Sequence, residues 1–138
     1  MSGATKPLPQ PDPVTAPFWA SVRAHAMQIQ RCRACGQHIF YPRGLCPHCF
    51  ASDLEWVQVS GQGTVYAFTI VHRHPNPAFQ ADVPYIVALV ELAEGVRLLG
   101  NLTGIAPDPA VVKVGLPVEI AYDDVSPDIS LPVFRPRG

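Results

Sequence analysis

The sequence has few charged residues and no long hydrophobic run. Charged side chains make up 15% of its 138 residues, against roughly 25% in a typical soluble domain, which excludes a disordered polyelectrolyte. The longest uninterrupted apolar run, Ile86–Val90, is far too short to span a bilayer. Met1–Val14 contains one lysine and no apolar segment typical of a secretory signal peptide. We therefore expect a cytoplasmic protein, in which cysteines stay reduced unless a metal holds them.

Long helices and common catalytic motifs are also missing. The chain has 16 prolines, and an internal proline removes a helical hydrogen bond and clashes with the preceding turn. The sequence contains no glycine-rich phosphate loop, no G-x-S-x-G, no H-E-x-x-H and no cysteine–histidine nucleophile pair. We therefore do not expect the chain to catalyse a reaction on its own.

What remains is one short helix, a cysteine-rich segment and a series of short strands. Pro17–Gln30 is the helix candidate, because Pro17 suits the first helical position and apolar residues recur at three- and four-residue steps. The predicted strands are 56–59, 64–73, 85–92, 96–102 and 118–123. Five short strands without a second helix favour a closed OB-fold barrel, since a sandwich usually needs about seven.

These elements predict a mainly β protein with three parts. Residues 1–16 are expected to form a disordered, proline-rich arm. Residues 17–53 hold the N-terminal helix and a rubredoxin-like four-cysteine zinc ribbon. Residues 54–138 form the OB-fold barrel, followed from residue 126 by an irregular tail with three more prolines. The nearly continuous apolar run at 85–92 predicts a strand that is buried on both faces.

Four cysteines form two C-x-x-C motifs ten residues apart, at Cys32, Cys35, Cys46 and Cys49. A two-residue gap lets both sulfurs of one motif face a single ion, and a hairpin brings the second motif opposite the first. This spacing predicts one structural Zn²⁺ with a closed shell of four thiolates. Iron in a rubredoxin-like site is the alternative, because four thiolates suit either metal.

The helix has an apolar face with two interpretations. Phe18, Trp19 and Val22 lie on that face. The helix either packs on its own domain or offers Phe18 and Trp19 to a partner protein.

The net charge of −1 conceals an uneven distribution. Residues 1–50 carry five basic residues and one acidic residue, whereas residues 51–138 carry five basic and ten acidic residues. Arginines and aromatics surround the cysteines, and such groups can receive a phosphate-bearing nucleotide with a stacked base. They are Arg31, Arg33, Phe40, Tyr41 and Arg43. A solvated ribbon surface is the alternative.

A second polar cluster follows the strand at 64–73. His72, Arg73 and His74 can together hold a phosphate or a carboxylate, and Phe79 in the next loop is either a lid or a core residue. A plain polar strand end is the alternative. The acidic second half argues against a strong nucleic-acid footprint, because phosphate contacts need Lys and Arg.

The chain resembles the zinc-ribbon/OB-fold acyl-CoA-associated family, long catalogued as a domain of unknown function. The resemblance covers roughly residues 17–136 and rests on the combination of motifs rather than on any one of them. The matching text is PFW at 17–19, CRACG at 32–36, YPRGLCPHC at 41–49, Trp56, SGQGTVYAFTIVHR at 60–73, PAF at 77–79, PYIVALVEL at 84–92, GLPVEI at 115–120 and LPVFRP at 131–136.

The resemblance implies a non-catalytic accessory subunit in a hetero-oligomer. Similar proteins accompany thiolase-like enzymes, aldolases, acyltransferases or hydratases that act on acyl-CoA. The helix and ribbon are then expected to dock on the catalytic subunit, and the ribbon and barrel to help bind the coenzyme A thioester through the arginines, histidines and aromatics named above. Two alternatives from other classes stay open: a nucleic-acid-binding module and a small rubredoxin-like electron carrier.

Overall fold

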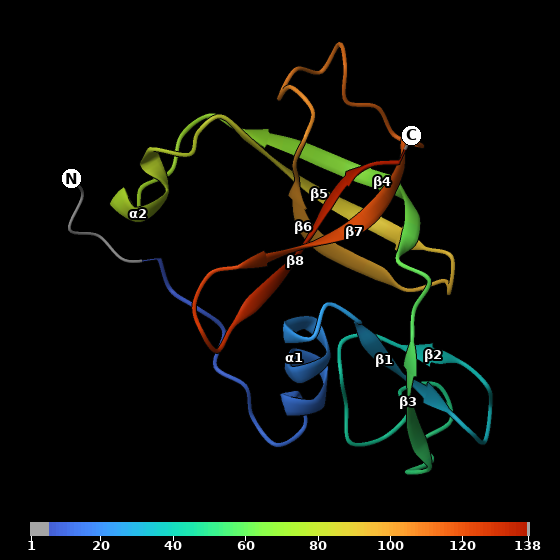
Figure 1. Cartoon of the computed structure of the whole chain (residues 1–138). Helices are drawn as coiled ribbons and strands as arrows, with labels where there is room; N and C mark the ends of the chain where they lie inside the picture. The colour runs from blue at the N-terminus through green and yellow to red at the C-terminus, as the bar shows by residue number, and fades with distance from the viewer. Residues whose placement is uncertain (1–5, 138) are drawn as a thin grey trace.

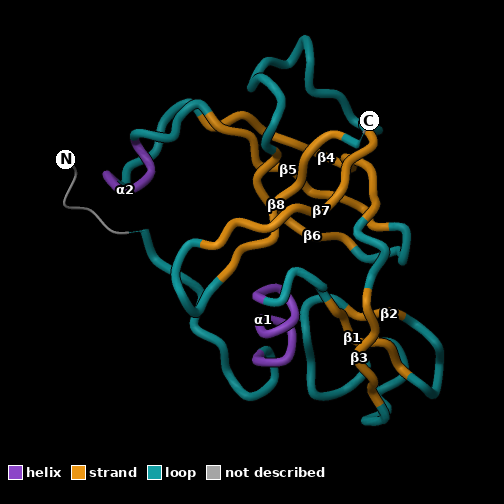
Figure 2. The backbone as a smooth tube through the Cα atoms, in the orientation of Figure 1, coloured by secondary structure: helices purple, strands orange, loops and turns teal. Residues whose placement is uncertain are grey.

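The computed structural model describes residues 6–137, which form two helices, a three-stranded sheet and a closed five-stranded barrel (Figures 1 and 2). The elements are α1 (Ala16–Arg23), β1 (Gln28–Cys32), β2 (His38–Ile39), β3 (Leu54–Gln58), β4 (Gln62–Val71), α2 (Pro77–Gln80), β5 (Tyr85–Leu92), β6 (Arg97–Leu102), β7 (Pro117–Asp124) and β8 (Ser130–Pro136). The predicted mainly β fold with an N-terminal helix and an OB-type barrel is confirmed.

Helix α1 is shorter than the predicted Pro17–Gln30. Its regular turns end at Arg23, and the chain leaves the helix through His25, whose φ is 58°. Residues from Gln28 onward form β1 instead. Met27 and Ile29 are both buried, and a spacing of two residues places them on one face of an extended chain, whereas on a helix they would point to opposite sides.

The arm that precedes α1 is only partly described, because residues 1–5 of the predicted disordered arm lie outside the described residues. In the rest of the arm, the Asp12 carboxylate accepts hydrogen bonds from the N–H groups of Val14 and Thr15 and forms the turn that enters α1. Lys6 forms an ion pair with Asp82, beyond α2.

The ribbon sheet has the order β2-β1-β3, and both pairings are antiparallel. The strand predicted at 56–59 for the barrel is therefore β3, which pairs with β1 from Cys32↔Leu54 to Gln28↔Gln58. The chain then passes directly into β4, so the ribbon and the barrel share a short connection.

The barrel has the order β4-β5-β6-β8-β7, with β4 and β7 closing the ring. Its fifth strand is β8, which lies where the sequence predicts an irregular tail. β8 pairs with β7 along its length, but it meets β6 at a single parallel position, Leu102↔Phe134. Because β8 is paired with β6 at only one position, few backbone N–H groups are needed on that side, and the prolines at 132 and 136, which lack an N–H, are tolerated there.

One main core joins the helix, the base of the ribbon and the barrel. Phe18 and Val22 of α1 pack with Met27, Ile29 and the inward side chains of the barrel strands. On β5 these are Ile86, Ala88, Val90 and Leu92, while the alternate residues are half-buried, so the prediction of burial on both faces is wrong. In Figure 1, α1 lies below the barrel and beside the ribbon.

The outer part of the ribbon has only a small separate core. Cys32, Ile39 and Cys46 are buried there, with Ala51 and Leu54 packed against them. This is too little apolar surface to hold a segment of chain without a metal or another cross-link.

Candidate metal centre and the neighbouring groove

The two C-x-x-C motifs form matching knuckles. The first follows the end of β1 at Cys32, and the second lies in the loop between β2 and β3. In each, the residue after the second cysteine has a left-handed backbone: Gly36 has φ 79° and Phe50 has φ 65°. Gly36 N–H donates to the carbonyl of Cys32, and Phe50 N–H donates to that of Cys46. The glycine is the natural choice at this position, whereas Phe50 is an unusual one.

The four sulfur atoms lie within 4.8 Å of one another. Sγ of Cys32 is 3.6 Å from Sγ of Cys49, and Sγ of Cys35 is 3.7 Å from Sγ of Cys46. A tetrahedron with Zn–S bonds of about 2.3 Å places its sulfurs roughly 3.8 Å apart. The side chains therefore fit one tetrahedral ion, and a shell of four thiolates leaves no position for water or substrate.

Backbone N–H groups lie close to the sulfurs of Cys32 and Cys46. The N–H of Cys35 lies 3.5 Å from Sγ of Cys32, and that of His48 lies 3.4 Å from Sγ of Cys46. Burial disfavours the Cys46 thiolate, but backbone donors from Cys49 and His48 outweigh it and lower the pKa of Cys46 to about 7. A thiolate is the form that binds a metal.

A groove lies beside the ribbon, between it and the β5–β6 turn of the barrel, with a volume of about 400 Å³. Its lining residues are Gln37, His38, Ile39, Phe40, Arg43, Pro47, His48, Glu94, Gly95, Val96 and Arg97. His38 and His48 belong to this groove, while the metal cluster consists of the four cysteines. The structure therefore brings Phe40 and Arg43, two predicted coenzyme A contacts, into one cavity.

The other predicted ribbon contacts are differently placed. Arg31 forms an ion pair with Glu55 at 3.1 Å, and Arg33 lies 2.8 Å from Asp53 and 3.5 Å from Glu55. Two of the three ribbon arginines are thus neutralised by acidic residues in and before β3. Tyr41 is exposed next to Phe40.

The cluster after β4 lies apart from the ribbon. His72, Arg73 and His74 begin the loop that contains α2, and Figure 1 places α2 at the opposite end of the molecule from the ribbon. The ring of His74 packs on that of Phe79 with centroids 4.7 Å apart, and Lys6 lies over the same phenyl ring. The predicted coenzyme A contacts therefore form two separate groups rather than one site.

The predicted docking residues of α1 are mostly buried. Phe18 and Val22 are 1% and 0% exposed, and both belong to the main core. Trp19 is partly buried beside Phe18, with ring centroids 5.0 Å apart. Neither Phe18 nor Val22 is accessible to a partner in this packing, which favours the interpretation that the helix packs on its own domain.

Sequence reasoning missed the barrel side of the groove. Oε2 of Glu94 accepts a hydrogen bond from Ser60 N–H at 2.8 Å, while Oε1 of Glu94 is buried and has no partner among the described residues. Arg97 follows in β6 and lies 3.2 Å from Glu91. No local motif signals this contribution, because only the fold brings residues 94–97 to the ribbon.

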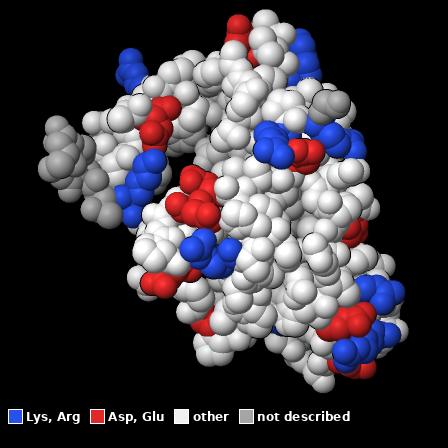
Figure 3. Space-filling view, viewed as in Figure 1, with Lys and Arg blue, Asp and Glu red and all other residues white. Residues whose placement is uncertain are grey.

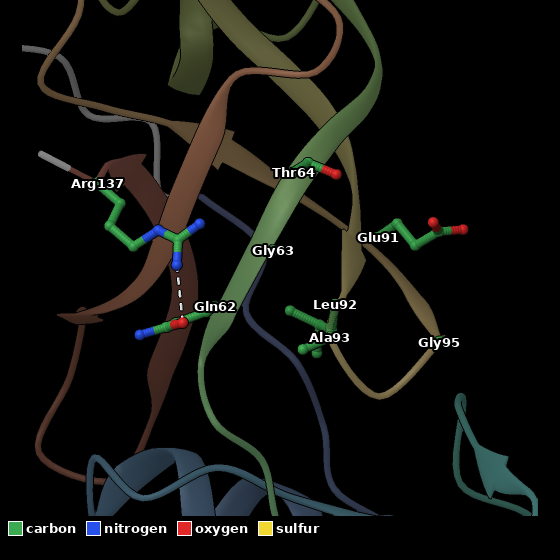
Figure 4. A pocket seen from close by; sticks show the side chains of 8 residues that line it. All are labelled: Gln62, Gly63, Thr64, Glu91, Leu92, Ala93, Gly95 and Arg137. Atoms are coloured by element: carbon green, nitrogen blue, oxygen red, sulfur yellow. Dashed lines mark hydrogen bonds between the residues drawn. The ribbon is translucent and has the colours of Figure 1, made fainter.

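A second, shallower pocket lies where β4 leaves the ribbon, and Figure 4 shows its lining residues. Arg137 donates to the side chain of Gln62 at 2.7 Å. The carboxylate of Glu91 extends on the other side of β4, so the polar groups do not converge (Figure 4).

Figure 3 shows charges in small groups of mixed sign, separated by wide uncharged areas on the face in view. No helix among residues 6–137 combines the length and the hydropathy that crossing a bilayer needs.

Comparison with known proteins gives consistent results over most of the chain. The rubredoxin-like zinc ribbon domain of ChsH2 matches residues 28–55, and the C-terminal OB-fold domain of ChsH2 matches residues 56–123. A solved structure described as an Ltp2-ChsH2(DUF35) aldolase contains a similar chain, with 41% identity and a TM-score of 0.83 over 93% of this chain and 98% of that one.

Two curated proteins have related sequences. A probable enoyl-CoA hydratase alpha subunit of Thermomonospora curvata is 41% identical over 96% of this chain and 40% of its own length. The benzoylsuccinyl-CoA thiolase subunit BbsA of Thauera aromatica is 33% identical over 68% of this chain and 62% of its own length. The chain thus spans less than half of the hydratase subunit. The ribbon with its four sulfurs, the barrel order and these matches together show that the chain belongs to the DUF35 family of zinc-ribbon/OB-fold proteins.

Proposed function

We propose that this chain is an accessory, non-catalytic module of an enzyme complex that acts on acyl-CoA. The observation that carries this proposal is that one architecture, a zinc ribbon joined to an OB barrel, matches proteins named for three different reactions: hydration, thiolysis and aldol cleavage. A module that accompanies different reactions is expected to supply binding and assembly, while another chain supplies the reacting groups.

The structure supports this division of labour. A closed thiolate shell gives the metal a structural role, since catalytic zinc keeps an open position. The metal then holds a ribbon that lacks a core of its own. The partner that fits these comparisons is a thiolase-like, aldolase or hydratase subunit, and the ligand is its coenzyme A thioester.

The second knuckle supplies an apolar surface for docking. Phe50 is 76% exposed and Leu45 is 52% exposed, on either side of the cysteines at 46 and 49. A large exposed aromatic residue on a rigid, metal-held loop suits a buried interface contact. We therefore assign the docking contact to the knuckle rather than to Phe18 and Val22, which the core already uses.

Co-purification tests the proposed function. The tagged chain, isolated from its native cells, is expected to retain an acyl-CoA enzyme in a fixed stoichiometry, identified by mass spectrometry. Phe50→Asn removes the aromatic contact and leaves a residue that tolerates a positive φ, so it is expected to weaken the complex without unfolding the ribbon. Leu99→Asn, at an exposed position on β6, is the matched control. Recovery of nucleic acid alone, or of no enzyme, would contradict the proposal.

A further inference from the structure

We infer that the groove between the ribbon and the β5–β6 turn binds the phosphoadenosine end of coenzyme A, with Arg43 as its phosphate ligand. The identity of the ligand rests on the proposed function, whereas the site itself rests on the geometry of the groove.

Arg43 differs from the other ribbon arginines in being unpaired. Arg31 and Arg33 are neutralised by Glu55 and Asp53, but no carboxylate or side-chain acceptor binds the Arg43 guanidinium within residues 6–137. An unpaired guanidinium beside a cavity retains all its donors for a ligand, and its planar fork matches a phosphate group.

The backbone of Arg43 is held in place from the core. The side chain of Gln30 is 95% buried, and both of its polar atoms bind residue 43: Oε1 accepts from Arg43 N–H at 2.7 Å and Nε2 donates to Arg43 C=O at 2.8 Å. Fixing the backbone of a binding residue reduces the entropy lost when its side chain engages a ligand. Two hydrogen bonds from a buried amide thus prepare the loop that carries Arg43.

The remaining walls suit a nucleotide more than a simple anion. His38 and His48 add ring N–H donors from the ribbon, and Phe40 adds an aromatic surface. The opposite wall includes Glu94, whose Oε2 accepts a hydrogen bond from Ser60 N–H. This carboxylate disfavours a continuous phosphate backbone, so a single nucleotide fits better than a nucleic acid strand.

The size of the groove is consistent with this ligand. Its volume of about 400 Å³ lies at the lower end of the range for small-molecule pockets, roughly 300–1,000 Å³. It accommodates the nucleotide end of coenzyme A and leaves the pantetheine arm free to extend towards a catalytic partner.

An NMR titration of the isolated, zinc-loaded chain tests this inference. Adenosine 3′,5′-bisphosphate is added up to about 10 mM, so that even a millimolar Kd is detected. Amide shifts are expected at the groove residues, and adenosine without phosphate is expected to cause much smaller ones. Arg43→Gln should weaken binding about tenfold, the loss expected when one charged hydrogen bond to phosphate is removed.

Lys113→Gln is the matched control, because Lys113 is exposed, does not line the groove and has no ion pair within residues 6–137. It should leave the affinity unchanged. The inference would be overturned if the amide signals of the groove residues did not shift, or if both variants weakened binding equally. It would also be overturned if a single-stranded oligonucleotide bound more tightly than the bisphosphate, with a steep dependence on salt. Arg43→Gln is expected to keep its enzyme partner in the co-purification, so failure of the nucleotide site is distinguishable from failure of the proposed function.

Discussion

Nε2 of His25 lies 2.8 Å from Oδ1 of Asp124, and these two residues tie the end of α1 to the last turn of the barrel. Arg23 reaches the same carboxylate at 3.1 Å, and the Ser130 hydroxyl donates to it as well. The His25 ring stacks on Tyr122 with centroids 4.7 Å apart. The joint between helix and barrel is therefore polar at its rim and apolar at Phe18 and Val22 beneath it.

We predict that Asp124→Asn destabilises the chain in a pH-dependent manner. The hydrogen bond from His25, followed by that from Ser130, lowers the pKa of Asp124 below 3.8. A carboxylate with a lowered pKa in the folded state stabilises the protein above the unfolded-state value, and this contribution is lost as the pH falls through the lower folded value. Denaturant unfolding should thus show a deficit for the variant that is present at pH 5 and shrinks as the pH falls below about 4. Asp123→Asn, next in sequence and without a hydrogen bond or ion pair from its carboxylate within residues 6–137, should show no such trend.

Removal of the metal should unfold the ribbon before the barrel. Cys46→Ala takes away one of four ligands, and the small core of the outer ribbon contains, besides the ligands Cys32 and Cys46, only Ile39 as a buried residue. Metal analysis of the purified variant should show loss of zinc, and NMR should show collapse of signals from the ribbon while many barrel signals persist. His48→Ala is the control, because the imidazole lies outside the sulfur cluster. Full metal content in Cys46→Ala would contradict the four-thiolate site.

The position of Gly63 in β4 leaves no room for a side chain. A Cβ atom there would lie 2.5 Å from the carbonyl oxygen of Glu91 and 2.9 Å from Cγ1 of Val90. We expect Gly63→Ala to lower the free energy of unfolding by roughly 1–3 kcal/mol, as overpacking usually does. Gly44→Ala has open space around it and should be nearly neutral. Urea unfolding of both variants provides the comparison, and equal stabilities would refute the predicted clash.

Truncation of Phe18 separates the two interpretations of the helix. A buried phenyl ring replaced by alanine leaves a cavity and typically costs about 3–5 kcal/mol. Phe18→Ala is therefore expected to lower the unfolding free energy strongly, and Trp19→Ala less, because Trp19 is only partly buried. Thermal and urea unfolding of the isolated chain measure this. A Phe18→Ala variant of full stability that fails only in complex formation would restore the docking interpretation.

The metal site and the barrel class were predictable, because both rest on local patterns. The two C-x-x-C motifs determine the four ligands by spacing alone. The apolar composition of residues 85–92 identifies this segment as a barrel strand. The predicted helix was too long because Ile29 also fits the three- and four-residue steps that begin at Phe18, whereas its burial together with Met27 follows the two-residue spacing of extended chain. β8 was missed because Pro132 and Pro136 indicate a loop, whereas only the single contact with β6 makes them acceptable. Only the ribbon side of the groove, with Phe40 and Arg43, could be predicted from the sequence, because residues 94–97 come next to Arg43 only in the folded chain.

The place of β8 in the barrel has a consequence for synthesis on the ribosome. Phe134, which is fully buried in the main core, belongs to the final strand of the ring. While the chain is being made, the ribbon can bind metal early, but the edges of β6 and β7 stay uncovered until residues 130–136 emerge. Nascent chains at that stage present open strand edges to their neighbours. A chaperone or a partner subunit that arrives before residues 130–136 have emerged would therefore meet a barrel whose ring of strands is still open.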